Sequence, residues 1–349
     1  MNVKAQQTLA SKLSTKQALR TGERNDRTSE SSGTTSAWLA AAKNIACATL
    51  WITLSAAVIL YNKYILTEHG SHGNSGSKGF PFPITLTMWH MLFSGLLATA
   101  MIKMGLVESA NIEPSTYAKG VLPIASLFAG TLWLGNTAYM YLSVSFIQML
   151  KALMPAAVFF VGCLLRTETF SWSQAGNMAV ITAGVAIASA GEVTLVFWGV
   201  LFQMGSIVSE SVRLTLVQIL LQRRGLKLNP VTTLYYVAPA SFVCLALPWS
   251  ILEAPALLDV MQYGTVRYSW LIFFSNATVA FSLNLSVFLL IGRTSALTMN
   301  VAGVIKDWLL IGLSTALFKS PVTTLNLFGY LIAFTGVCWY NYAKANAAR

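Results

Sequence analysis

Long apolar runs fill the chain from Asn44 onward, and they constrain its fold more than any other feature. Each run reaches about 20 residues, the length that an α-helix needs to cross the hydrocarbon core of a bilayer. Charged residues make up 10% of the 349 residues, against roughly 25% in an ordinary soluble domain. Because lipid offers no hydrogen-bond partner to exposed backbone, the pattern predicts an all-α polytopic membrane protein and excludes a soluble or disordered chain.

We predict ten transmembrane helices, over 44–66, 82–104, 121–142, 144–165, 174–191, 194–221, 231–252, 268–291, 295–318 and 324–342. Positively charged loops stay in the cytosol. With both termini cytosolic, only four basic residues lie on the opposite side: Lys63, Lys78, Arg267 and Lys319. The net charge of +11 therefore sets the topology, and nucleic acid is not an expected partner.

The ends of the chain and its cysteines carry little chemistry. Residues 1–43 form a polar tail, expected to be cytosolic and disordered, and 346–349 form a second cytosolic end. The tail lacks the apolar core of a signal peptide, although its basic, hydroxylated composition leaves a plastid transit peptide open. All four cysteines fall within spans, without a CxxC spacing, so we expect no metal and no cofactor.

The two halves of the chain, 44–191 and 192–345, resemble each other. Corresponding landmarks occur in the same order in both: Pro83-Ile84-Thr85 and Pro230-Val231-Thr232, Asn136 and Asn284, Lys151 and Lys306, and the glycine pairs 176/184 and 329/336. A unit of five spans is odd, so its second copy enters the membrane from the opposite side. The sequence therefore predicts two inverted five-helix repeats, the architecture of secondary transporters.

Five ionisable residues lie inside the predicted spans: Lys151, Glu210, Arg213, Lys306 and Asp307. Each costs about 2.5–3.5 kcal/mol on insertion scales, so such residues usually face a cavity or a partner. Glu210 and Arg213 are three residues apart on one helix, which favours a neutralising pair over Arg213 as a substrate ligand. Three bases against two acids leave a lysine available to an anionic solute.

Lys151 lies on a polar face of the fourth span, with no acid nearby on its own helix. Ser145, Gln148 and Lys151 recur at a spacing of three and offer a hydroxyl, an amide and an ammonium. Pro155 continues this stripe and removes a backbone hydrogen bond, which favours a bend. The face is suited to a hydrated anion.

Lys306 and Asp307 are adjacent in the ninth span, hence about 100° apart around the helix, and we expect them not to face each other directly. In a purely structural alternative, each lysine pairs across helices with Asp307 or Glu210. The equivalent positions of Lys151 and Lys306 in the two halves favour function instead, because the two lysines would converge on one site.

Two further ionisable groups leave alternatives open. Lys63, flanked by tyrosines near the end of the first span, either snorkels to the interface or lines the cavity. His90 is favoured as a hydrogen-bonded core histidine, with a proton relay as the alternative. The sequence contains no phosphate-binding loop and no catalytic Ser/His/Asp set, so we expect a transporter that is neither an enzyme nor an ATP-driven pump.

Four stretches form a recognisable set: Asn62-Lys63, Phe80-Pro81-Phe82-Pro83, SVSFIQMLKALMP over 143–155 and SALTMNVAGVIKD over 295–307. They resemble the triose-phosphate translocator family, within the drug/metabolite transporter superfamily, and the likeness covers about 44–345. This resemblance implies a ten-span antiporter that exchanges a phosphorylated metabolite for phosphate or a nucleoside monophosphate.

The plastid phosphate translocators of that family carry an arginine where this chain has Asp307, a histidine at Gln148 and a glutamate at Met154. The Lys-Asp version is similar to a plant subgroup of Golgi and endomembrane members, which includes UDP-arabinofuranose transporters and proteins called sugar-phosphate/phosphate translocators. The resemblance therefore implies import of a UDP-type nucleotide sugar into the Golgi, with the plastid envelope as the alternative location.

On this resemblance, Lys151 and Lys306 would bind the phosphate groups of the anionic substrate, with Lys63 at one end of the site. The predicted binding site also includes Gln148, Ser145, Asn300, Asn62, Tyr141 and Asn284, whereas Glu210, Arg213 and Asp307 would form gating or structural charge pairs. The alternatives are a plastid sugar-phosphate/phosphate translocator and a non-transporting membrane scaffold. The sequence leaves the oligomeric state open, a homodimer included.

Overall fold

The structure is a computed structural model, and it describes residues 42–67, 79–107, 112–193, 195–224, 230–263, 270–291 and 296–347. Contacts divide the chain into two units, 1–49 and 50–349, and every packing contact given below lies within 50–349. The described residues form helices and no strand, which confirms the predicted all-helical class. Most of the predicted tail lies outside the described residues.

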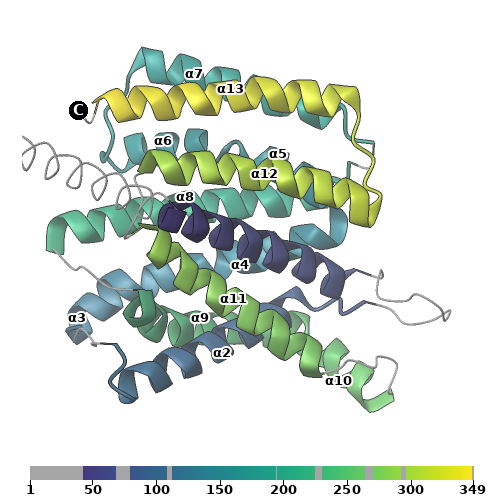
Figure 1. The fold of residues 1–349 in the computed structure, drawn as a ribbon. Helices are drawn as coiled ribbons and strands as arrows, with labels where there is room; N and C mark the ends of the chain where they lie inside the picture. The colour runs from purple at the N-terminus through teal and green to yellow at the C-terminus, as the bar shows by residue number, and fades with distance from the viewer. Residues whose placement is uncertain are drawn as a thin grey trace, which may run out of the picture. The chain divides into compact units, whose positions relative to one another are not determined.

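The helices follow the apolar runs of the sequence. In order they are Ala42–Leu66, α2 (Pro83–Lys103), α3 (Pro114–Thr116) with the π-helical turn η2 (Tyr117–Val121) and α4 (Leu122–Tyr141), α5 (Val144–Lys151), α6 (Met154–Leu164), α7 (Trp172–Ala190), α8 (Phe197–Arg224), α9 (Pro230–Leu252), α10 (Ala254–Tyr263), α11 (Trp270–Ile291), α12 (Ala296–Phe318) and α13 (Thr324–Ala347) (Figure 1).

Seven helical segments among the described residues are long and apolar enough to span a membrane, which supports a polytopic membrane protein. They correspond to the first four, the sixth, the seventh and the eighth predicted spans. The remaining three predicted spans coincide with α7, α12 and α13, which form helices but are not among the seven. The count of ten spans and the two inverted repeats therefore stay predictions.

The fourth predicted span differs from a single continuous helix. α5 ends at Lys151 and α6 begins at Met154, with two turn residues between them. The N–H groups of Ala152 and Leu153 bond to carbonyls three residues back, at 3.2 and 3.0 Å. Pro155 explains the break, because it has no N–H to donate to the carbonyl of Lys151. The predicted bend is thus a local interruption of the helix just after Lys151.

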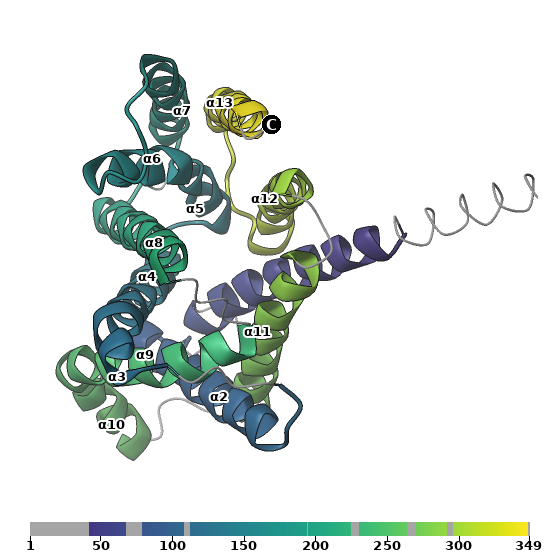
Figure 2. The ribbon, with the colours of Figure 1, turned by 90° about the vertical axis from the view of Figure 1, so that its left-hand side faces the viewer.

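Three antiparallel helix pairs organise the bundle. α2 packs along α9, α4 along α8, and α7 along α13. The α7–α13 pair lies side by side in both views (Figures 1 and 2). Here Gly184 approaches the backbone of Ala333, and Gly329 approaches that of Ala188, so closely that an added Cβ would lie 2.4 and 2.2 Å from the facing nitrogens. Only glycine permits this approach of the two helices.

The start of α2 is held by a residue distant in sequence. Glu253, just after α9, accepts hydrogen bonds from Ile84 N at 2.7 Å and from Thr85 N and Oγ1 at 2.7 and 2.8 Å. Phe82, at the N-cap position, offers no side-chain cap, so the Glu253 carboxylate satisfies the free N–H groups and faces the positive end of the helix dipole. Burial nevertheless raises the pKa of the Glu253 carboxyl above its usual value, and the three hydrogen bonds oppose that rise.

Candidate functional site

Lys151 ends α5, a helix that Ser143 begins with a hydroxyl cap. Its ammonium lies over the ring of Tyr139, with Nζ 6.0 Å from the ring centroid. Nζ forms no ion pair with any carboxylate of the described residues, although Asp307 and Glu210 act on it electrostatically. Lys151 is therefore a half-buried cation without a direct counter-ion in the described part of the chain.

Lys306 and Asp307 form an ion pair, with Lys306 Nζ 3.2 Å from Asp307 Oδ1. The expectation that these neighbours do not face each other is therefore wrong. Their Cβ atoms diverge by about 100°, but the four-carbon stem of lysine is long enough to bring the ammonium around the helix. Lys306 Nζ also lies 5.7 Å from the ring centroid of Trp51, so both predicted binding lysines lie over an aromatic face.

Tyr139 connects these groups, although the sequence interpretation passed over it. The side chain is 5% exposed. The Lys151 ammonium lies over the Tyr139 ring, and the Tyr139 hydroxyl interacts with Gln148. Lys306 and Asp307 both act electrostatically on Tyr139. The structure packs α12, which carries Lys306 and Asp307, against α5, which carries Gln148 and Lys151, and the Lys151 ammonium lies over this buried tyrosine. We call Lys151, Gln148, Tyr139, Lys306 and Asp307 the Tyr139 cluster.

Lys63 binds backbone rather than an acid. Its Nζ donates to the carbonyls of Tyr139, at 2.5 Å, and Leu142, at 3.0 Å. These carbonyls lie at the end of α4, where a cation is favourable to the helix dipole. Lys63 therefore holds the α4–α5 junction beside the Tyr139 cluster, a role that neither sequence alternative included.

The polar face of α5 is buried. Ser145 is 1% exposed, and its Oγ lies 3.1 Å from that of Ser143. Gln148 is also 1% exposed, and neither its Nε2 nor its Oε1 meets the geometry of a hydrogen bond with any described residue. The nearby Tyr139 hydroxyl is the polar interaction that we find for this amide. Gln148 thus retains hydrogen-bonding capacity next to Lys151.

Two other predicted site residues have different contacts, and the side chain of a third is not described. Tyr141 is exposed and stacks on Phe202 of α8, with ring centroids 5.8 Å apart. Asn284 Nδ2 donates to the carbonyl of Ala280 in its own helix at 3.1 Å. Asn300 belongs to α12, but its side chain lies outside the described part of the structure. Their roles in binding stay predictions.

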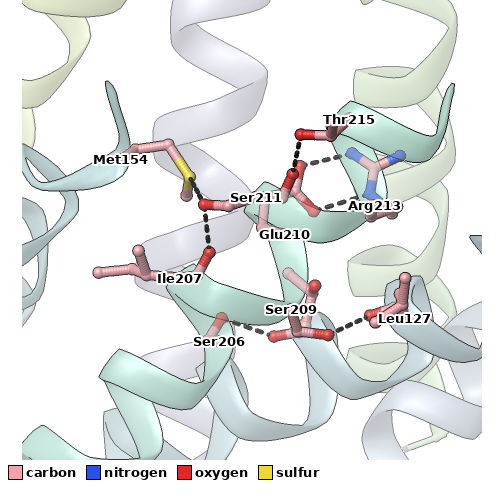
Figure 3. A network of polar contacts seen from close by, with 10 residues as sticks. Leu127, Met154, Ser206, Ile207, Ser209, Glu210, Ser211, Arg213 and Thr215 are labelled. Atoms are coloured by element: carbon pink, nitrogen blue, oxygen red, sulfur yellow. Dashed lines mark hydrogen bonds and ion pairs between the residues drawn. The ribbon is translucent and has the colours of Figure 1, made fainter. Parts of the chain in front are cut away.

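Glu210 and Arg213 form the predicted local pair on α8. Arg213 Nε donates to Glu210 Oε2 at 2.7 Å, and a terminal guanidinium nitrogen donates to Oε1 at 2.5 Å (Figure 3). This two-point geometry confirms the neutralising pair. In the same view Ser211 Oγ donates to Met154 Sδ at 3.5 Å, which joins α8 to the start of α6.

A second polar region, the asparagine chain, links four helices through side chains that are at most 7% exposed. His90 bonds Asn276 Oδ1, and Asn276 Nδ2 donates to Asn62 Oδ1 at 2.9 Å. Asn62 Nδ2 donates to Asn136 Oδ1 at 3.2 Å, and Asn136 Nδ2 donates to Thr87 Oγ1 at 3.0 Å. His90 is therefore a hydrogen-bonded core histidine, as predicted. Both amide atoms of Asn62, a predicted substrate ligand, already have protein partners.

A cavity of about 250 Å³ lies between α2, α10 and α11. Its lining is mainly apolar: Phe80, Thr85, Trp89, Leu257, Met261, Trp270 and Phe273. The indole N–H of Trp89 donates to the Phe273 carbonyl, and Thr85 Oγ1 donates to Glu253. The described residues that line this cavity include no cation.

Known proteins resemble this chain over most of its length. The model of the Triose-phosphate Transporter family matches residues 43–341. A protein of Arabidopsis thaliana named "probable sugar phosphate/phosphate translocator" is 50% identical over 301 residues, which is 86% of this chain and 83% of its own length. A GDP-mannose transporter of the same plant is 28% identical over 296 residues, 84% of each chain.

A solved crystal structure shares 13% identity with this chain and covers 89% of it and 99% of its own chain, with a TM-score of 0.50, a likeness of fold alone. The family match covers far more than half of the chain, and relatives reach half identity over most of their own length. The resemblance inferred from the residues is thereby confirmed, and the chain belongs to the triose-phosphate transporter family.

Proposed function

We propose that the protein is a secondary antiporter that exchanges a nucleotide sugar of the UDP type for a nucleoside monophosphate across the Golgi membrane. The observation that carries the proposal is the Tyr139 cluster, in which Lys151 has no described counter-ion while Lys306 is paired with Asp307. A phosphate group would give Lys151 the charge-assisted partner that the protein does not supply.

The proposed architecture is ten transmembrane helices in two inverted repeats, 44–191 and 192–345, with both termini in the cytosol. Inverted repeats place corresponding helices antiparallel. Two such pairs, α2 with α9 and α7 with α13, are antiparallel and tightly packed, which supports the proposal. Transporters of this kind bind substrate near the bilayer midplane between their repeats.

Obligatory exchange would follow from the charge of the site. An empty site leaves Lys151 uncompensated, and moving an uncompensated cation through a low-dielectric interior is unfavourable. A bound anion neutralises it and lets the protein reorient. After it releases a substrate on one side, the transporter would therefore reorient only when it has bound another anion.

A sugar phosphate exchanged for inorganic phosphate, across the plastid envelope, is the second candidate. The names of the relatives at 50% identity favour it, because they are sugar phosphate/phosphate translocators. The GDP-mannose transporter at 28% identity is a nucleotide-sugar carrier and favours the first. Both cargoes carry the phosphate group that Lys151 and Lys306 would bind.

Counterflow in proteoliposomes tests the proposal. Vesicles with the full chain are preloaded with uridine monophosphate or with inorganic phosphate and then offered labelled nucleotide sugars and sugar phosphates. We expect uptake of a nucleotide sugar that depends on internal nucleotide. Uptake of sugar phosphate that depends on internal phosphate would establish the second candidate instead, and localisation of a tagged chain would separate Golgi from plastid.

Failure of all phosphorylated compounds, both in counterflow and in protecting the purified protein against heat, would overturn the antiporter and favour a scaffold. Empty vesicles and vesicles loaded with sulfate serve as controls, because they separate specific exchange from leak.

A further inference from the structure

Gln203 of α8 is the second buried amide whose hydrogen bonds the protein leaves open. It is 0% exposed, and neither Nε2 nor Oε1 has a hydrogen-bond partner among the described residues. Gln148 of α5 likewise meets no hydrogen-bond geometry with a described residue, although the Tyr139 hydroxyl interacts with it. A buried amide without partners destabilises a protein, so two of them are unexpected in a well-packed bundle unless a bound molecule completes them.

The position of Gln203 follows from its neighbours on α8. Gly199 lies against Tyr141 and Leu142, directly before α5, and Ser211 bonds Met154 at the start of α6. Residues four apart share one face of a helix, and Gln203 lies between these two contact points at that spacing. Gln203 therefore lies on the side of α8 that faces the α4–α5 junction and the start of α6.

The same contacts set the register of the two amides. The chain advances twelve residues from Leu142 to Met154, and also from Gly199 to Ser211, so α5 and α6 run parallel to α8. Gln148 is six residues after Leu142, and Gln203 is four after Gly199. Both amides therefore lie between the same two contact points, Leu142 with Gly199 and Met154 with Ser211.

We infer that Gln203 and Gln148 together form a neutral subsite that binds the hydroxyl-rich or amide-like part of the substrate, beside the lysine that binds its phosphate. This inference rests on the proposed function, which it extends by a residue on a helix with no predicted substrate ligand. Lys151 is one helical turn beyond Gln148, and the acid of α8 that acts on it, Glu210, is two turns beyond Gln203.

The chemistry of the pair fits that part of a sugar compound. Each primary amide offers two donors and one carbonyl acceptor, so the two can bond sugar hydroxyls or the edge of a nucleobase, which both donate and accept. Inorganic phosphate has neither sugar hydroxyls nor a nucleobase edge. The amides would therefore distinguish the sugar compound from phosphate, whereas Lys151 binds either.

Replacing Gln203 by leucine, a side chain of similar size, tests the subsite. The full chain is purified, its melting temperature is measured without ligand, and counterflow is compared for inorganic phosphate, a hexose phosphate and UDP-sugars. We expect the ligand-free melting temperature to stay level or rise, because an unpartnered amide is removed. Preference for the sugar compound over phosphate should fall about five- to tenfold, the worth of one to two hydrogen bonds.

Gln218→Leu is the matched control, because it makes the same change at a partly exposed position of α8. An unchanged preference in Gln203→Leu, or a marked loss of ligand-free stability, would overturn the subsite and make the amide structural. If the wild-type chain exchanges no phosphorylated compound, the proposed function fails. If the wild type exchanges phosphorylated compounds and Gln203→Leu has the same preference, only the subsite is overturned and the proposed function stands.

Discussion

The asparagine chain and the Tyr139 cluster are both polar regions inside an apolar bundle, but they differ in how completely their groups are bonded. In the asparagine chain each amide donates and accepts within the protein, from His90 through to Thr87. In the Tyr139 cluster Lys151 has no described counter-ion, and neither Gln148 nor Gln203 of α8 meets hydrogen-bond geometry with any residue that the structure describes. Because an unsatisfied buried polar group is costly, the bonds of the first region stabilise the fold, and we propose that a ligand completes those of the second.

Lys151→Met should have the largest effect on transport. A charge-assisted hydrogen bond to phosphate contributes about 1.5–3 kcal/mol, so exchange should fall about 10- to 100-fold. The ligand-free melting temperature should not fall, because no partner is stranded. Counterflow and thermal unfolding measure the two effects, with Lys103→Met, at the exposed end of α2, as the control. Normal exchange, or a large loss of stability, would remove the distinction between the two regions.

Asn62→Ala should show the reverse behaviour. The change strands Asn276 Nδ2 and Asn136 Oδ1, so the free energy of unfolding should fall by about 1–3 kcal/mol, towards the lower end if lipid-embedded groups find other partners. Any molecules that remain folded should keep their cargo preference. Asn284→Ala is the control for stability, because its Nδ2 donates to the carbonyl of Ala280 in its own helix. A shift in cargo preference with unchanged stability would indicate that Asn62 belongs to the binding site.

Glu253→Gln should have the smallest effect, and one that depends on pH. Burial raises the pKa of this carboxyl in the folded protein, so folding takes up a proton at pH values between the ordinary and the raised pKa. The stability of the wild type relative to Glu253→Gln should therefore be greatest below the ordinary carboxyl pKa of about 4.3 and decline as the pH rises through the raised value. Melting temperatures between about pH 4 and pH 7 measure it. A difference that grows with pH would show that the hydrogen bonds to α2 outweigh burial.

Much of the candidate site could be read from local spacing. Glu210 and Arg213 pair as expected because both lie on one helix three residues apart. The interruption after Lys151 also follows from one residue, Pro155. The ion pair between Lys306 and Asp307 did not follow, because the angle between their Cβ atoms says little about where a long, flexible side chain ends.

Other parts of the site had no local signal. Tyr139 appears in the sequence as one of several aromatic residues in an apolar run, and Tyr141, two residues later, looked equally suitable. They point to different sides of α4, and only the packing of the neighbouring helices buries one and exposes the other. Gln203 could have been noted as an amide two turns before Glu210 on an apolar helix, although nothing local shows that its bonds stay open.

The sequence by itself determined the all-helical membrane class, the family and the lysines that make an anion site reasonable, because these depend on composition, run length and contiguous motifs. Tertiary structure alone decided which buried polar groups have partners. Asn62 meets Asn276 across 214 residues, and Glu253 meets Ile84 across 169. Such contacts depend on how distant helices pack, which the spacing along one helix does not encode. Only the fold therefore distinguishes the asparagine chain, whose amides are bonded, from the Tyr139 cluster.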